Sequence, residues 1–204
     1  MRARKKKHGA ERLEAVSQLF VERPVIDKDK KTYVEIGCGK GKFIIENAER
    51  NPDINYIAIE KVPDVILLAA EKVKEKEIKN VKFMMCDAKG LTELFEEKSI
   101  DLIFLNFSDP WPKAKHYKRR LTYKTFLDVY RYILKDDGVI CFKTDNAGLF
   151  EFSLEQFRED GWRLENVTFD LHNSEYAKDN IMTEYEKNFS EKGFNIHRLE
   201  AYKK

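Results

Sequence analysis

Three carboxylates stand at the ends of short apolar runs, and three alternating glycines follow the first of them. Glu35 leads into the sequence Gly37-Cys38-Gly39-Lys40-Gly41, Glu60 follows residues 55–59, and Asp87 follows residues 81–86. The carboxyl ends of neighbouring strands in an open α/β sheet meet at one edge, where such sheets bind cofactors. Carboxylates gathered there repel one another unless a cation or several hydrogen-bond donors arrive. We therefore expect a cofactor site at this edge.

The glycine loop narrows the kind of cofactor. A dinucleotide loop reads G-x-G-x-x-G and a P-loop ends in Gly-Lys-Ser/Thr, but here Gly41 is followed by Lys42 and neither motif is met. A short glycine loop with Glu35 at its entrance suits S-adenosylmethionine, which has an ammonium and a sulfonium group and no pyrophosphate. Glu60 is placed to accept hydrogen bonds from both ribose hydroxyls of an adenosine. The alternative is a plain strand-to-helix turn with Glu60 as a surface carboxylate.

A second group of residues suited to binding or catalysis follows the most apolar run of the chain, residues 100–107. Its sequence is Ser108-Asp109-Pro110-Trp111-Pro112, and the basic run 113–120 follows at once. The two prolines restrict the backbone and hold an aromatic face beside a carboxylate, which is useful at a binding site. Alternatively, the loop only caps the core. An apolar wall, an acid and a basic patch thus lie within about a dozen residues of each other.

Positive charge is concentrated in two places. The formal net charge of +2 comes from 38 basic and 36 acidic residues, and ten of the basic ones lie in residues 1–8 and 113–120, which contain no acid. Two basic patches on an otherwise acidic chain indicate a polyanionic partner such as nucleic acid, although the first could be a solvated tail. We expect residues 1–8 to form a flexible arm and residues 9–204 a single domain, because 204 residues with 42% hydrophobic content suffice for one core.

Other classes of protein are disfavoured. No apolar run approaches the roughly 20 residues that span a bilayer, and the basic start lacks the apolar stretch of a signal peptide. We therefore expect a soluble, cytoplasmic protein without a membrane partner. The three cysteines and four histidines are scattered along the chain, which suggests neither a disulfide framework nor a metal site.

Apolar periodicity predicts the elements that position these residues. Strands are expected at 33–36, 55–59, 81–86, 100–107, 139–145 and 162–169, with an edge strand at 195–202. Helices are expected at 10–22, 42–50, 64–77, 91–96 and 147–159, and at 122–134 with Thr122 as its N-cap and residues 135–138 as its end. Residues 170–180 read as a loop. Alternating strands and helices with a final β-pair indicate a Rossmann-like α/β fold.

Three motifs point to a family. They are Glu35 to Gly41, Asn106 to Lys113 with the basic residues that follow, and Thr183-Glu184-Tyr185-Glu186. The glycine loop is common to many methyltransferases, whereas the other two motifs together are specific. Nearly the whole chain beyond residue 8 resembles the bacterial tRNA (guanine-N7)-methyltransferase family.

The resemblance implies a class I methyltransferase fold, with a seven-stranded mixed sheet, its last strand antiparallel, and helices on both faces. It implies S-adenosylmethionine as cofactor, tRNA as partner, 7-methylguanosine in the tRNA variable loop as product, and Asp109 as the catalytic residue. The chain would act as a monomer or homodimer without an obligate protein partner. Cofactor contacts would be Glu35, Gly37, Gly39, Glu60, Asp87 and Asp109. Substrate contacts would be Lys113, Asp145, Thr183, Glu184, Tyr185 and Glu186, and further RNA contacts Lys115, His116, Tyr117, Lys118, Arg119 and Arg120.

The implied chemistry depends on placement. Guanine N7 has a free lone pair and no proton, so methyl transfer needs in-line alignment and not a base. Asp109 and Asp145, with Glu186 behind them, could accept from the guanine edge and balance the charge of the methylated ring; Asp145 could instead cap the next helix. A methyltransferase for another RNA, for protein or for a small molecule, and a non-catalytic RNA-binding protein, remain alternatives. Transfer of labelled methyl groups to bulk tRNA separates them.

Overall fold

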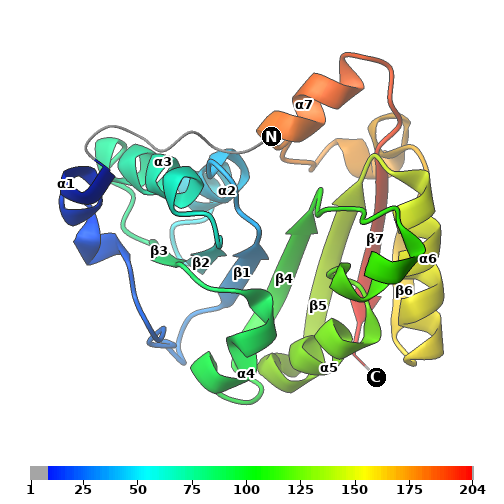
Figure 1. The fold of residues 1–204 in the computed structure, drawn as a ribbon, viewed down its shortest axis with the longest axis horizontal. Helices are drawn as coiled ribbons and strands as arrows, with labels where there is room; N and C mark the ends of the chain where they lie inside the picture. The colour runs from blue at the N-terminus through cyan, green and yellow to red at the C-terminus, as the bar shows by residue number, and fades with distance from the viewer. Residues whose placement is uncertain (1–8, 204) are drawn as a thin grey trace.

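A mixed sheet forms the centre of the molecule (Figure 1). The computed structural model describes residues 9–203, so the predicted arm 1–8 lies outside the described residues. Within them, seven strands pair in the order β3-β2-β1-β4-β5-β7-β6. Neighbouring strands from β3 to β5 are parallel, and β7 is antiparallel to both β5 and β6. The strands are β1 (Thr32–Ile36), β2 (Asn55–Ile59), β3 (Val81–Met84), β4 (Ile100–Asn106), β5 (Leu134–Thr144), β6 (Arg163–Thr168) and β7 (His197–Tyr202).

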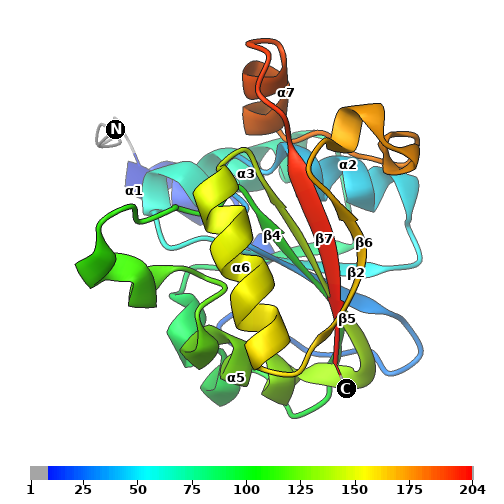
Figure 2. The ribbon, with the colours of Figure 1, turned by 90° about the vertical axis from the view of Figure 1, so that its right-hand side faces the viewer.

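Helices cover both faces of this sheet (Figure 2). Apolar residues of α2 and α3, such as Ile44 and Ala69, join one buried cluster, and those of α5 and α6, such as Leu127 and Phe150, join another. The helices are α1 (Gly9–Glu14), α2 (Lys42–Arg50), α3 (Pro63–Glu75), α4 (Leu91–Leu94), α5 (Lys124–Ile133), α6 (Ala147–Glu159) and α7 (Glu184–Ser190). Short 3-10 turns are η1 (Ser17–Leu19), η2 (Ala88–Gly90), η3 (Ala114–Arg119), η4 (Leu171–Asn173) and η5 (Glu175–Ala177). The predicted mixed sheet with its last strand antiparallel and helices on both faces is confirmed.

The prediction that residues 195–202 form an edge strand is wrong. β7 lies between β5 and β6, and β6 forms the edge. Leu199 and Ala201 of β7 are fully buried, while Arg198, Glu200 and Tyr202 are half-buried. An alternating pattern of this kind reports one buried face and not the number of neighbouring strands, so the pattern could not separate the two positions.

Three helix predictions also need correction. Residues 10–22 form the shorter α1 and then η1, with Val16 buried between them. The hydroxyl of Thr122 does not cap α5, because it is buried 2.7 Å from the Ser153 hydroxyl, and Tyr123 is the N-cap residue. Residues 135–138 belong to β5, which begins at Leu134 and pairs irregularly with β4 there. The two errors at α5 reflect contacts with α6 and β4 that override a local signal.

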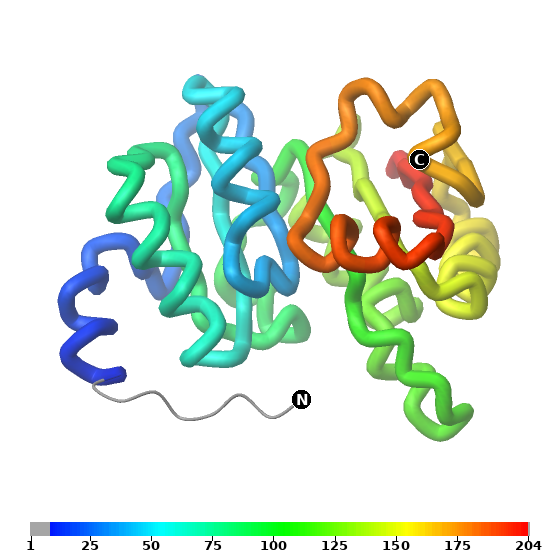
Figure 3. The backbone as a smooth tube through the Cα atoms, turned by 90° about the horizontal axis from the view of Figure 1, so that it is seen from above, coloured from blue at the N-terminus to red at the C-terminus, as the bar shows by residue number. Residues whose placement is uncertain are grey.

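The fold brings several segments to the carboxyl edge of the parallel strands. The strand order reverses between β1 and β4, which is where open α/β sheets form a binding crevice. Seen from above, α7 lies across this edge beside α2, and the loop after β4 projects outward (Figure 3). Among residues 9–203, no helix is long and apolar enough to cross a membrane.

Candidate active site

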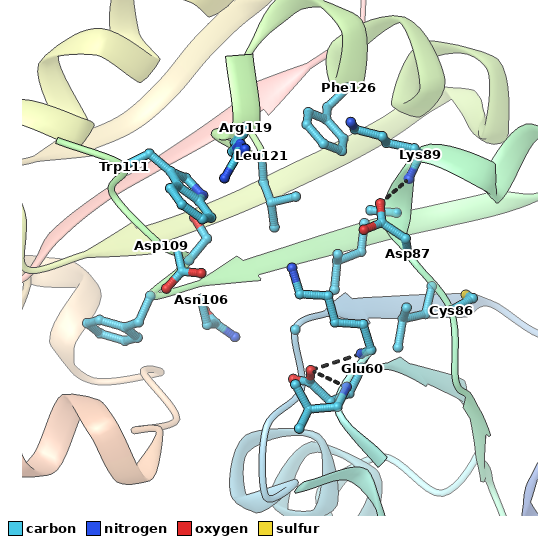
Figure 4. A pocket seen from close by; sticks show the side chains of 18 residues that line it. Glu60, Cys86, Asp87, Lys89, Asn106, Asp109, Trp111, Arg119, Leu121 and Phe126 are labelled. Carbon is cyan, nitrogen blue, oxygen red and sulfur yellow. Dashed lines mark hydrogen bonds between the residues drawn. The ribbon is translucent and has the colours of Figure 1, made fainter. Parts of the chain in front are cut away.

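A cavity of about 590 Å³ opens at the carboxyl edge of the sheet (Figure 4). Gly37, Glu60, Asp87 and Asp109 line it, each following a different parallel strand. A second cavity of about 310 Å³ adjoins it and is lined by Glu35, the remaining loop glycines and the segment from Thr183 to Tyr185. Both linings include Gly37, Asn106 and Phe107. The structure therefore brings the predicted cofactor residues together around two connected spaces.

The glycine loop is fixed to the neighbouring strand. The backbone N–H groups of Gly37 and Cys38 donate to the Ile59 carbonyl at 2.8 and 3.0 Å. Gly41, at the start of α2, has φ of +79°, and a Cβ atom there would lie 2.6 Å from Cβ of Ala69. Only glycine fits this position, because both its backbone angle and its distance from α3 exclude a side chain. The loop is thereby held at the mouth of both cavities.

Glu35 is a buried acid with one free oxygen. Its residue is 2% exposed, Oε1 accepts a 3.0 Å hydrogen bond from Nδ2 of Asn106, and Oε2 has no hydrogen-bond partner within the described chain. Burial, and to a smaller extent the charge of Glu60, raises the pKa of Glu35 to about 7. The hydrogen bond from Asn106, the charge of Lys143 and the nearby Ile44 N–H lower it. An orphaned buried carboxylate oxygen is costly unless a donor reaches it. The side chain therefore suits a cationic ligand group.

Glu60 ties the end of β2 to the glycine loop. Its Oε2 accepts from the backbone N–H of Gly39 at 3.3 Å, and its Oε1 accepts from the N–H groups of Lys61 and Val62 at 2.9 and 3.0 Å. The latter two bonds are drawn in Figure 4. Each carboxylate oxygen accepts more than one bond, so Glu60 retains capacity for ligand hydroxyls while ordering its own loop.

Asp87 and Asp109 differ in how firmly the protein holds them. Oδ1 of Asp87 caps η2 by accepting from the Lys89 N–H at 3.0 Å. Asp109 is exposed and lines the cavity between Asn106 and Trp111 (Figure 4). Both carboxylates face the large cavity, and Asp109 is the nearer to the basic run.

The loop from Phe107 to Trp111 is held in an unusual conformation. Phe107 and Trp111 have φ of 52° and 41°, a region that costs non-glycine residues on the order of 1–3 kcal/mol. Arg120 braces the loop by donating from Nε to the Pro110 carbonyl at 2.9 Å and from Nη2 to the Trp111 carbonyl at 3.3 Å. The Arg119 guanidinium lies 4.9 Å from the centre of the Trp111 ring. Contacts from the basic run therefore shape the cavity wall.

The basic residues 113–120 include exposed side chains suited to binding phosphate and one arginine with a structural role. Lys113, Lys115 and Lys118 are exposed on or beside η3, as a phosphate-binding patch requires. Arg120 is different, because it is half-buried and its guanidinium packs 4.4 Å from the Phe152 ring centre while it braces the loop. The prediction of RNA contact at these residues stays a prediction, but Arg120 has a structural role that its sequence position did not reveal.

The predicted substrate segment forms the start of α7. Thr183 caps this helix, with its hydroxyl 2.8 Å from the Glu186 N–H. The exposed Tyr185 ring packs on Phe189 at a centroid distance of 4.1 Å and lies 5.1 Å from Phe107 at the cavity mouth. A salt bridge of 3.3 Å joins Glu184 to Lys40 of the glycine loop. Thr183, Glu184 and Tyr185 thus stand opposite the glycine loop.

Glu186 lies elsewhere. It is fully buried, and its carboxylate accepts from Lys143, His172, Asn180 and the Thr183 N–H. A carboxylate enclosed by four protein donors has no surface to offer a substrate in this structure. The prediction of direct substrate contact by Glu186 is therefore at odds with its burial.

Asp145 does not cap α6. Asn146 does so, by accepting the Leu149 N–H at 2.8 Å. Burial raises the pKa of the Tyr185 hydroxyl, and the Asp145 charge raises it further, which places Asp145 near Tyr185. Asp145 and Lys113 lie outside the linings of the two cavities, and their predicted contacts with substrate stay predictions.

Comparison with known proteins decides the family. A family model described as “Putative methyltransferase” matches residues 29–199. A protein of Streptococcus agalactiae named tRNA (guanine-N(7)-)-methyltransferase is 48% identical over 210 residues, covering 98% of this chain and 99% of its own. A protein of Brevibacillus brevis with the same name is 51% identical, covering 89% of each chain.

The chain belongs to the tRNA (guanine-N7)-methyltransferase family.

Solved structures support the fold of this tRNA (guanine-N7)-methyltransferase family member. A precorrin-6y C5,15-methyltransferase from Geobacter metallireducens superposes with a TM-score of 0.59 at 19% identity, covering 94% of this chain and 88% of that one. A structure titled as an antibiotic-related methyltransferase gives the same score and identity over 98% and 94% of the two chains. At such identity the likeness shows the class I methyltransferase fold alone.

Sequence reasoning missed two residues of this family member's site. Asn106 holds Glu35 and lines both cavities, and Lys143 holds Glu186. A signal existed for each, since Asn106 ends the most apolar run and Lys143 interrupts another apolar strand. A polar residue buried inside such a run needs a hydrogen-bond partner, but the sequence does not identify that partner.

Proposed function

We propose that this chain transfers the methyl group of S-adenosylmethionine to N7 of a guanine in tRNA. The observation that carries the proposal is the near full-length match, at 48% identity, to a protein named tRNA (guanine-N(7)-)-methyltransferase. The carboxylate-lined cavity beside an exposed basic run supports it, because that cavity suits a cationic cofactor and the basic run suits a polyanionic substrate.

The donor and acceptor set fits the cofactor. Glu35 Oε2 lacks a partner and would accept from the ammonium, and Glu60 would accept from the ribose hydroxyls. Asp87 lies along the same wall and would accept from the adenine end. When bound, S-adenosylmethionine supplies an electrophilic methyl group. The protein's residues supply the alignment and the charge around it.

The reaction needs no proton acceptor at the nucleophile. Guanine N7 carries a lone pair, so the barrier depends on in-line placement and on balancing the positive charge that the ring acquires. Asp109 stands at the cavity rim, where an ionised carboxylate would stabilise that charge and accept from the guanine edge. The rings of Phe107, Trp111 and Tyr185 surround the entrance and would keep water from the methyl group. We assign catalysis to Asp109.

The tRNA would approach over η3. Lys115 and Lys118 are exposed there and would neutralise phosphates, as would Lys113. We propose a guanine of the variable loop as the target, because an unpaired base can enter a cavity without opening a helix. A cytoplasmic location and a monomer or homodimer accord with this function.

A transfer assay tests the proposal. The purified chain is incubated with bulk tRNA and methyl-labelled S-adenosylmethionine, and the digested RNA is separated so that the labelled nucleoside is identified by mass spectrometry. We expect the labelled nucleoside from the tRNA to be 7-methylguanosine. In a parallel reaction with double-stranded DNA in place of tRNA, we expect no transfer. Another labelled nucleoside would indicate a methyltransferase with a different target, and tRNA binding without transfer would indicate a non-catalytic RNA-binding protein.

A further inference from the structure

Lys143 is a buried lysine in the middle of the sheet, outside the cofactor residues. It lies near the end of β5 and is 5% exposed. Its ammonium donates to Oδ1 of Asn180 at 2.9 Å, to the Ile181 carbonyl at 2.9 Å and to Oε2 of Glu186 at 2.7 Å. All three acceptors belong to residues 171–190, which we call the α7 segment. One side chain of the sheet thus holds three points of this segment.

We propose that Lys143 is a positioning residue for methyl transfer, and that its ammonium fixes the α7 segment so that Thr183 and Tyr185 stand at the cavity mouth. The inference rests on the proposed function for its activity test. It concerns a residue that lines neither of the two cavities of the site. Lys143 lines a third cavity, of about 520 Å³, and would touch neither cofactor nor guanine.

The α7 segment has few backbone attachments to the rest of the described chain. Within the described chain, its backbone hydrogen bonds outside helices close local turns, except for the bond from the Leu171 N–H to the Ile196 carbonyl at 2.7 Å. The Lys40–Glu184 bridge is about half-exposed at both ends, and exposed pairs contribute little. The position of the segment therefore depends on its side chains. Leu171 and Ile181 are buried, Arg198 packs on the Tyr176 ring, and Lys143 with Glu186 provides a buried polar attachment.

The hydrogen bonds to the Glu186 carboxylate fix how the α7 segment is oriented relative to Lys143. Oε1 of Glu186 accepts from Nε2 of His172 at 2.9 Å and from Nδ2 of Asn180 at 2.6 Å. Its Oε2 accepts from the Lys143 ammonium. Although burial alone raises the pKa of Glu186, the Lys143 ammonium and these hydrogen bonds hold it below its usual value. The carboxylate is therefore ionised and accepts from η4, from the loop before α7 and from β5 at once.

The direction of the hydrogen bonds that Lys143 donates distinguishes a positioning role from a contribution to the stability of the fold alone. An apolar pair of similar volume often replaces a buried ion pair at no cost in stability, whereas removing one partner leaves an uncompensated charge. An apolar pair cannot reproduce the three directed bonds of the Lys143 ammonium. Replacement of both partners removes the two buried charges together, but it also leaves His172, Asn180 and the Thr183 N–H without the acceptor that Glu186 gives them. We therefore expect a lower thermal midpoint together with a loss of the alignment of Thr183 and Tyr185.

The experiment compares the wild type, the double variant Lys143→Met/Glu186→Leu and the control Lys98→Met, whose lysine pairs with Asp136 in an exposed salt bridge. Three quantities are measured: the thermal midpoint, hydrogen exchange of peptides from residues 171–190, and kcat and KM for tRNA at saturating S-adenosylmethionine. A loss of folded enzyme lowers kcat and leaves KM unchanged, so KM separates positioning from stability.

We expect the double variant to fold with a lowered thermal midpoint, to lose protection in residues 171–190, and to show a KM for tRNA roughly tenfold higher, the scale of re-ordering one or two side chains on binding. Lys98→Met should match the wild type. A double variant with wild-type KM and wild-type protection would overturn the positioning role. If the double variant unfolds, Glu186→Gln, which keeps one acceptor, must raise KM or loosen the same peptides, and unchanged values would equally overturn it. A wild type that does not methylate tRNA would overturn the proposed function instead, while the exchange measurement would still test the attachment.

Discussion

The Asn106 amide donates a 3.0 Å hydrogen bond to one oxygen of the buried Glu35 carboxylate and leaves the other oxygen without a partner within the described chain. Asn106 ends β4 and Glu35 lies in β1, so the bond spans the point where the strand order reverses. The free oxygen makes the charge of Glu35 sensitive both to pH and to any cation that binds above it.

Affinity for S-adenosylmethionine should depend on pH through Glu35. Burial raises the pKa of this carboxyl to about 7, and only the ionised form pairs with the ligand ammonium. We expect affinity to rise by up to about tenfold per pH unit as pH approaches 7 from below, and to fall again near pH 8, where an α-amino group loses its proton. Calorimetry across this range checks the slope, and Glu35→Gln should abolish it. Affinity that is independent of pH in the wild type would contradict the assignment.

The raised pKa of Glu35 also predicts how the free energy of unfolding changes with pH. Its pKa is near 4.5 in the unfolded chain and about 7 in the folded protein, so the folded state binds more protons between these values. Its contribution to the free energy of unfolding therefore falls as pH rises through that interval. Comparison of denaturation curves for the wild type and Glu35→Gln isolates this contribution.

Removal of Glu60 should weaken the cofactor site. Glu60→Ala deletes the acceptor that we propose for the ribose hydroxyls and releases the N–H groups of Gly39, Lys61 and Val62. We expect a loss of roughly 1.5–3 kcal/mol in S-adenosylmethionine binding, the scale for hydrogen bonds to a charged group. Glu75→Ala, at the far end of α3, is the matched control. A folded Glu60→Ala variant of unchanged affinity would remove Glu60 from the site.

Lys118 and Arg120 should respond differently to substitution. Lys118→Ala should weaken tRNA binding and reduce the log–log salt slope by up to about 0.9, the value for one neutralised phosphate. Arg120→Ala should instead slow methylation even at low salt, because the carbonyls of Pro110 and Trp111 lose their brace. Lys30→Ala, in the loop before β1, serves as the control. Equal effects of Lys118→Ala and Arg120→Ala on the salt slope would refute this division of roles.

These contrasts show what the sequence could and could not predict. Apolar periodicity predicts the strands, and Glu35, Glu60 and Asp87 are expected at one edge because parallel strands end together. Glu60 and Asp87 line one cavity, whereas Glu35 lies inside β1 and lines the adjoining cavity. Local pattern could not show that Arg120 turns back to the loop before it. It also could not show that Glu186 turns inward, because burial of an acid depends on a distant lysine.

Errors of sequence-based placement share the same cause. Thr122 has the chemistry of an N-cap, but its hydroxyl meets Ser153 of α6 instead. β7 alternates between buried and half-buried residues, a pattern that edge and inner strands share, and β6 pairs on its other side. In each case a tertiary partner from a distant part of the chain satisfied the group, and nothing local to the residue identifies such a partner.

Asp109 should act through its charge and not as a base. Asp109→Asn keeps the size of the side chain, removes the charge and places a donor where the guanine edge also donates. We expect single-turnover methylation at saturating cofactor to slow by about 10²–10³-fold, the scale for one preorganised electrostatic group. The wild-type rate should be nearly the same in D₂O, because no proton moves. A several-fold decrease in D₂O would indicate proton transfer, and a normal rate for Asp109→Asn would remove Asp109 from the chemical step.

Transfer to guanine N7 is the central claim, and a tRNA transcript made with 7-deazaguanosine tests it most directly. In this transcript a C–H group replaces N7 and leaves the Watson–Crick edge of every guanine intact, so base pairing is preserved. We predict that the normal transcript accepts a methyl group and yields 7-methylguanosine, whereas the substituted transcript binds the protein and accepts none. Methyl transfer to the 7-deazaguanosine transcript at the normal rate would contradict the account.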